Sequence, residues 1–169
     1  SQSAGLFCLD SDLKFSQHLS GLSISNALCW SCDSRKLYHA DSPSNQLRVY
    51  DFDAVTGRIS NGKIFAQTDK NIEPDGACVD AEDYVWNAQW GGSQVVRYSP
   101  EGQIDSVLKM PVSQPTCVAF GGEDYSLLAV TSARKGLSEE SLGSQSDAGN
   151  LFIFKTAFKG LPESIFINR

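Results

Sequence analysis

Short apolar stretches alternate with polar turns along this chain, and the alternation recurs in three aligned units. Each unit has a polar first residue, an apolar strand, a polar turn, a second apolar strand, a loop and a third strand. The units are SNALCWSCDSRKLYHADS with QLRVYDFD, PDGACVDAEDYVWNAQW with QVVRYSPEG, and PTCVAFGGEDYSLLAVTSA with NLFIFKT. This pattern predicts antiparallel strands joined by short turns.

Further strands are expected around these units. Residues 62–66 and 104–109 each read as a fourth, outer strand, and residues 5–9 and 14–18 read as the last two strands of an earlier unit. Residues 135–149, rich in Ser, Glu and Gly, read as a long loop with one short helical turn. Four short strands every 40 to 50 residues or so are typical of a β-propeller blade. We therefore predict an all-β fold of four-stranded antiparallel blades, with residues 1–169 forming a partial propeller domain of about three to four blades.

The repeat brings three separated residues into register. Asn26, Asp75 and Thr116 occupy the same position, 49 and then 41 residues apart. The innermost strand of a blade runs along the central channel, so residues that begin these strands ring one mouth of it. Asn26 and Asp75 should therefore converge.

Their chemistry suggests a cation site. Amide and carboxylate oxygens are hard donors that suit Ca²⁺, Mg²⁺ or Mn²⁺, and a carboxylate also serves Zn²⁺. Pro74 and Gly76 hold Asp75 on a stiff corner where a strand begins. The alternative is that both residues only cap turns, since Asn and Asp side chains bond to nearby backbone.

Composition narrows the class of protein. The 169 residues fit one domain, and 41% hydrophobic residues allow a packed core. The net charge is −6 and no Lys/Arg cluster occurs, which argues against nucleic acid and anionic membrane surfaces as partners. No apolar run approaches the roughly 20 residues of a membrane span, and residues 1–5 lack the features of a signal peptide. We expect a cytoplasmic location.

Cysteine usage agrees with this expectation. The five cysteines are an odd number, which indicates reduced thiols rather than a disulfide framework. Cys29 and Cys32 do match C-x-x-C, but Cys29 lies in a strand-like run and Cys32 in the following turn. A redox pair needs its first cysteine at a helix N-terminus, and no second pair completes a zinc site. Both chemistries are disfavoured.

Several longer stretches together resemble the SMP-30/gluconolactonase/regucalcin family. They cover most of the chain and are far more specific than any single short motif. They are ISNALCWS (24–31), LYHADSPSNQLRVYDFDAVTGRISN (37–61), EPDGACVDAEDYVWNAQWGGSQVVRYSPEG (73–102), QPTCVAFGG (114–122), VTSARKGLSEE (130–140) and AGNLFIFKTAFKGLPE (148–163).

The resemblance implies a six-bladed propeller with one divalent cation (Ca, Zn, Mg or Mn) in its channel, and the family includes sugar-lactone hydrolases. The family's Asn and Asp ligands correspond to Asn26 and Asp75, and the aspartate is also cast as the general base. Ala27 stands where the family has the glycine of its S-N-G segment.

The length implies that only the C-terminal part of the family is present, three to four of six blades. The family's third ligand, a Glu, and the Arg and Asn of its first half have no counterpart here. We expect a missing N-terminal half, an oligomer or a partner chain to complete the propeller.

Other residues carry weaker expectations. Asp41, Trp90 and Thr116 are candidate substrate contacts, although Asp41 also suits turn capping and Trp90 a hairpin base. Ser132 is a channel-lining candidate, and Arg134 is expected on the surface. The residues expected in the core between blades are Trp30, Val79, Trp86 and Phe120.

Three functions remain open from the sequence. The favoured one is a metal-dependent hydrolase of sugar lactones or similar cyclic esters, in which Asp75 is both ligand and general base for a metal-activated water. The alternatives are a non-catalytic propeller that binds a divalent metal such as calcium, and an inactive fragment that needs its missing half or a partner.

Overall fold

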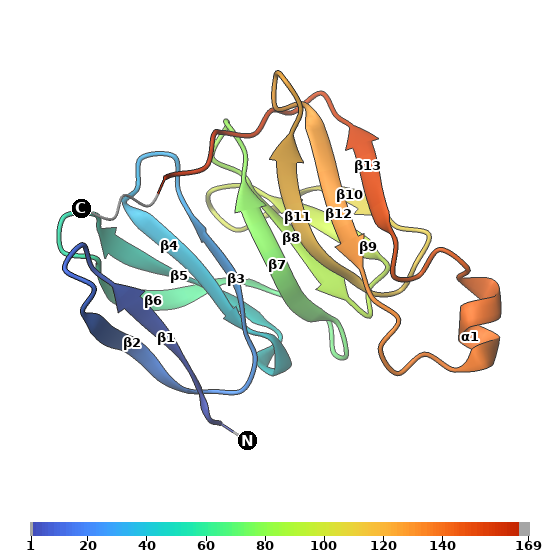
Figure 1. The fold of residues 1–169 in the computed structure, drawn as a ribbon, viewed down its shortest axis with the longest axis horizontal. Coiled ribbons are helices and arrows are strands. Elements are labelled where there is room, and N and C mark those ends of the chain that lie inside the picture. The colour runs from blue at the N-terminus through green and yellow to red at the C-terminus, as the bar shows by residue number, and fades with distance from the viewer. Residues whose placement is uncertain (1, 166–169) are drawn as a thin grey trace.

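The computed structural model describes residues 2–165 as antiparallel sheets arranged side by side (Figure 1). The first sheet has two strands and the next two have four each, as the repeat predicts. The fourth sheet has three strands. The strands are β1 (Ala4–Leu9) and β2 (Phe15–Leu22); β3 (Ser25–Trp30), β4 (Lys36–Asp41), β5 (Gln46–Asp53) and β6 (Arg58–Gln67); β7 (Glu73–Val79), β8 (Val85–Trp90), β9 (Gln94–Tyr98) and β10 (Ile104–Lys109); β11 (Pro115–Gly121), β12 (Leu127–Ser132) and β13 (Leu151–Lys155).

Helical structure is confined to two short pieces of the described chain. A 3₁₀ turn, η1 (Ser42–Ser44), joins β4 to β5, and α1 (Glu139–Ser144) lies in the long loop between β12 and β13. Ser138 caps α1 by accepting a hydrogen bond from the backbone N–H of Ser141. No helix within residues 2–165 has the length and apolar content needed to cross a membrane.

The first strands of the three larger sheets lie next to one another, in the order β3, β7, β11. All three carry a register irregularity near their start: between Asn26 and Cys29, between Pro74 and Ala77, and between Pro115 and Cys117. A bulge bends a strand and re-aims its side chains, and bulges are common beside active sites. The repeat therefore includes a shared distortion at the positions predicted to line the channel.

The core lies between neighbouring sheets. Ala40, Leu47, Val85 and Val96 are buried where the second and third sheets meet. Val95, Leu128 and Val130 are buried where the third and fourth sheets meet, together with Trp86. Phe120 is half-buried and packs edge-to-face on Trp86 with ring centroids 5.7 Å apart. Val79 is also half-buried and packs against the first of these clusters.

Trp30 does not lie in the core, so that expectation is wrong. Trp30 is 42% exposed and Leu28, on the same face of β3, is 43% exposed. The neighbouring first sheet covers only the outer part of this face, where Leu6 packs against Leu37 and Tyr50. That sheet has only β1 and β2, and the Trp30 ring packs edge-to-face on Phe52 with ring centroids 6.1 Å apart.

A buried arginine joins the third sheet to the C-terminal segment. Arg97 pairs with Asp80 at 2.8 Å, with Glu82 at 2.6 Å and with Asp105 at 2.9 Å. Its guanidinium also lies 3.9 Å from the ring centre of Phe158. The segment after β13 crosses the ends of β11 and β7 (Figure 1), and the backbone N–H of Ala81 donates to Lys159 O. These contacts lie at the far end of β7 from Asp75.

Candidate metal and catalytic site at the start of the inner strands

Asn26 and Asp75 line one pocket, as the repeat predicts. Its volume is about 430 Å³. The lining residues are Ile24, Asn26, Ser42, Glu73, Asp75, Trp90, Gln114, Lys135 and Gly136. Thr116 is not among them, and its hydroxyl instead shares a 2.7 Å hydrogen bond with the hydroxyl of Thr131.

The strand repeat also explains the pocket's rim. Ile24, Glu73 and Gln114 each stand two positions before Asn26, Asp75 and Thr116 respectively, and all three line the pocket. Three equivalent strand starts thus contribute an apolar, an acidic and an amide side chain. Ile24, Glu73 and Gln114 are therefore equivalent positions in the same strand alignment that pairs Asn26 with Asp75.

The corner between β4 and β5 fixes both strand starts. The Asp41 carboxylate accepts hydrogen bonds from the backbone N–H groups of Ser23, at 3.0 Å, and Ile24, at 2.8 Å. The amide of Asn45 donates to Ile72 O at 2.8 Å. One short corner therefore holds the loop before Asn26 and the loop before Asp75.

Asp75 is the most perturbed carboxylate of the site. It is half-buried, and burial together with the nearby charge of Glu73 raises its pKa to about 6, against a smaller lowering by the backbone N–H of Gly76. None of the ion pairs found among residues 2–165 includes Asp75. A half-buried carboxylate without a cationic side chain suits a bound cation or a proton-accepting role.

The described residues supply only part of a metal coordination shell. Asn26 and Asp75 offer oxygen donors, and Glu73 adds a second carboxylate on the same rim. No group of three or more His, Cys, Asp and Glu side chains in the described chain is arranged to hold a metal ion. Ca²⁺ takes six to eight oxygen ligands, so the donor type fits a hard cation and further oxygens must come from water or other protein segments.

The weaker site candidates from the sequence differ in whether they line the pocket. Trp90 lines the pocket, at the end of β8 and opposite Glu73 in register. Asp41 does not line it, and its carboxylate caps the Ser23–Ile24 loop. Ser132 donates to Asn150 O at 2.8 Å, and Arg134 is exposed.

Sequence reasoning missed Ser42, Glu73, Gln114 and Lys135. Glu73 and Gln114 could have been found by extending the strand alignment by two residues. Ser42 lies in a turn, where serine is common for local reasons, and Lys135 lies in the long loop that no repeat aligns.

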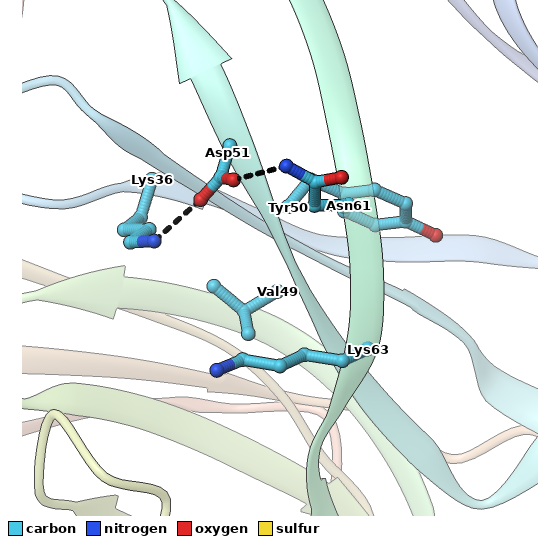
Figure 2. A pocket seen from close by; sticks show the side chains of 6 residues that line it. All are labelled: Lys36, Val49, Tyr50, Asp51, Asn61 and Lys63. Atoms are coloured by element: carbon cyan, nitrogen blue, oxygen red, sulfur yellow. Dashed lines mark hydrogen bonds and ion pairs between the residues drawn. The ribbon is translucent and has the colours of Figure 1, made fainter.

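A second, smaller hollow lies on the face of the second sheet (Figure 2). Its volume is about 220 Å³, and its carboxylate, Asp51, accepts hydrogen bonds from Lys36 at 2.5 Å and Asn61 at 2.7 Å. Those two contacts lower the pKa of Asp51. A surface carboxylate already satisfied by its neighbours offers less chemistry than Asp75.

The cysteines carry no sign of redox activation. All five are free thiols. Burial raises the pKa of Cys29, and burial with the neighbouring Asp83 raises that of Cys32 to about 11. A redox pair needs a lowered thiol pKa, so the raised pKa values of Cys29 and Cys32 argue against redox chemistry at this C-x-x-C motif.

Comparisons with known proteins agree with the predicted strand repeat. Residues 1–134 match the SMP-30/Gluconolactonase/LRE-like region. Regucalcin of Oryctolagus cuniculus is 38% identical over 93% of this chain and 54% of its own length. L-arabinolactonase of Azospirillum brasilense is 38% identical over 96% of this chain and 54% of its own length.

A solved structure shows the same architecture. The calcium-binding protein regucalcin of Agrobacterium tumefaciens superposes with a TM-score of 0.87 and 33% identity. The match covers 92% of this chain and 53% of that one. The chain thus spans about half the length of the relatives it matches, and it belongs to the SMP-30/gluconolactonase/LRE-like family.

Proposed function

We propose that the complete protein is a divalent-cation-dependent hydrolase of sugar lactones or similar small cyclic esters. The observation that carries the proposal is Asp75: a half-buried carboxylate with a raised pKa, beside Asn26 in one pocket. The relative named L-arabinolactonase supports the reaction class.

The cation would be held by Asn26 and Asp75. When bound, it would polarise the ester carbonyl and lower the pKa of a water. Asn26 is a neutral ligand, so it leaves more of the ion's positive charge to act on the substrate. Ca²⁺, Mg²⁺, Mn²⁺ and Zn²⁺ all accept these oxygen donors.

The chain's own residues have separate tasks in this proposal. Asp75, with a pKa of about 6, is largely ionised at pH 7 and can accept the proton of the attacking water. Trp90 and Ile24 provide apolar surface in the pocket for a sugar ring. Lys135 places a positive group on the same rim, where hydrolysis creates a carboxylate product.

The remaining ligands and substrate contacts would come from protein outside this chain. Leu28 and Trp30 at one end of the sheet array, and Leu151 and Ile153 at the other, are exposed apolar residues. We propose that further propeller sheets, from a missing N-terminal half or another copy, cover them. The free state of all five cysteines supports a cytoplasmic location.

The experiment is a lactonase assay on the complete protein with a divalent cation present. Asp75→Asn should lower kcat at least about 100-fold, because removal of a general base typically costs 10²–10⁴-fold. Thr116→Ala, at the aligned position outside the pocket, is the matched control and should retain activity. Equal activity in Asp75→Asn and wild type would contradict the proposal.

A second candidate function is a non-catalytic calcium-binding propeller. It is favoured by the solved structure described as a calcium-binding protein. Cation binding that depends on Asn26 and Asp75, without hydrolysis of any sugar lactone tested, would identify this alternative.

A further inference from the structure

We propose that Ser42 is a positioning residue that fixes the amide of Asn26 with its carbonyl oxygen toward the pocket. This inference rests on the proposed cation site and deepens it. In this proposal the buried hydroxyl of Ser42 determines whether Asn26 presents its carbonyl oxygen or its NH₂ group to the cation.

The hydrogen bonds of Ser42 determine its donor and acceptor roles. Ser42 is 2% exposed, and its Oγ lies 2.7 Å from Pro74 O and 2.9 Å from Asn26 Nδ2. A carbonyl oxygen can only accept, so the single hydroxyl hydrogen of Ser42 is donated to Pro74 O. Only lone pairs of Ser42 Oγ remain for Asn26.

The orientation of Asn26 follows from this. Turning the amide over would place Asn26 Oδ1 against the Ser42 lone pairs, with two acceptors facing each other in a buried contact. Asn26 therefore presents its NH₂ group to Ser42. Its Oδ1 is left on the other branch of the amide, available to the pocket that Asn26 lines.

This orientation matters because the two ends of an amide act oppositely on a cation. Oδ1 carries lone pairs and can coordinate an ion, whereas an NH₂ group presents positive hydrogens. Partners that orient metal ligands are commonly as necessary as the ligands themselves.

The same hydroxyl also reaches the Asp75 strand. Pro74 directly precedes Asp75, so the Asn26–Ser42–Pro74 chain of hydrogen bonds joins the two proposed ligands through side chains. Ser42 is itself held from its backbone, where its N–H donates to Ile24 O at 2.9 Å. Ser42 thus links β3 and β7 at the level of the site.

The first test is calorimetric Ca²⁺ titration of the complete protein. Ser42→Ala should weaken Ca²⁺ binding by about 10- to 100-fold, the usual loss for an orienting partner. Ser44→Ala, on the exposed side of the same 3₁₀ turn, should leave it unchanged. Thermal melts without Ca²⁺ show whether each variant remains folded.

A double-mutant cycle separates orientation from general support of the site. In Asn26→Asp both side-chain oxygens accept, so the ligand needs no orienting. Adding Ser42→Ala to that background should then weaken Ca²⁺ binding less than about threefold, far below the loss expected from an orienting partner. An equal loss in both backgrounds would overturn the proposal.

A measurement without cation keeps the test independent of the proposed function. In wild type the Asn26 side-chain NH₂ protons should exchange slowly with water by NMR, and in Ser42→Ala they should exchange at least about tenfold faster, as expected when the hydrogen bond is lost. Equal exchange rates would overturn the proposal. Failure of wild type to bind Ca²⁺ with this exchange difference present would contradict only the cation site.

Discussion

At the scale of single residues, the proposed site depends on Asp75, which belongs to none of the ion pairs found among residues 2–165. Asp75 sits half-buried next to Glu73, and burial raises its pKa above that of an ordinary aspartate. Asp53 is a contrasting case: its carboxylate accepts hydrogen bonds from Thr56 and from backbone N–H groups, and these bonds lower its pKa. This contrast is what the proposed role of Asp75 as cation ligand and general base rests on.

The opposite pKa shifts of Asp75 and Asp53 predict that, without bound cation, Asp75→Asn and Asp53→Asn change thermal stability with opposite pH dependences. Because the pKa of Asp75 is raised, its protonated form contributes stability to the folded state below about pH 4. This contribution is lost as the pH rises through about 6. Asp75→Asn should therefore melt above wild type at pH 8, with the gain disappearing near pH 4. The lowered pKa of Asp53 has the opposite sign, so Asp53→Asn should melt below wild type at pH 8. Thermal melts at both pH values test this, and an Asp75→Asn gain that persists at pH 4 would contradict the assignment.

At the scale of elements, the neighbouring strands β7 and β11 approach closely at Gly76. A Cβ added to Gly76 would lie 2.8 Å from the Cα of Cys117, a backbone atom of the neighbouring strand. Gly121, farther along β11, has nothing within 4 Å of an added Cβ. Gly76 therefore lies in a close contact of β7 and β11 at the end that carries the proposed site, whereas Gly121 has room for a side chain.

Alanine substitutions at Gly76 and Gly121 should have very different effects on stability. Gly76→Ala should destabilise the protein by about 1–3 kcal/mol, as overpacking typically does, because β11 must shift as a unit. Gly121→Ala should be nearly neutral. Urea unfolding measures both, and equal midpoints for the two variants would show that the strands can separate without cost.

Breaking the buried ion pairs of Arg97 should destabilise the protein more than breaking the exposed ion pair between Lys36 and Asp51. Arg97→Met leaves Asp80, which is fully buried, without its cation and should cost about 3–5 kcal/mol. Lys36→Met breaks an exposed pair with Asp51 and should cost at most about 1 kcal/mol. Denaturant unfolding distinguishes the two, and a small loss for Arg97→Met would mean that Trp86 and backbone N–H groups satisfy Asp80 alone.

Sequence reasoning predicted the strand repeat and the meeting of Asn26 with Asp75 because both follow from periodicity. It misplaced Trp30, since alternation shows which face of a strand is apolar but not whether a neighbouring sheet covers that face. It also missed Ser42, because hydrogen bonds to Pro74 and Asn26 join residues that lie far apart in sequence.

At the scale of the whole molecule, the row of sheets is open at both ends. The first and last sheets lie far apart (Figure 1), and exposed apolar side chains occur on each. Phe15 on β2 is 76% exposed, and Leu151 on β13 is 59% exposed. Closed propellers bury such surfaces between blades, whereas contiguous exposed apolar surface favours association.

The 169-residue chain alone should therefore associate in solution. Light scattering should report a mass above 18.4 kDa, and replacing Leu28 and Trp30 with Ser should reduce it. Val55→Ser is the control, since Val55 is 94% exposed in a turn away from the sheet faces. A stable monomer at all concentrations would show that the open faces are tolerated.

The central claim is that Asn26 and Asp75 hold one divalent cation at the start of the inner strands. The most direct test is a crystal structure of the complete protein grown with Ca²⁺. The account predicts a single ion in this pocket, with Asn26 Oδ1 and an Asp75 carboxylate oxygen at about 2.3–2.6 Å, the usual Ca²⁺–oxygen distance. An ion bound elsewhere, or a pocket holding only water at saturating Ca²⁺, would contradict it.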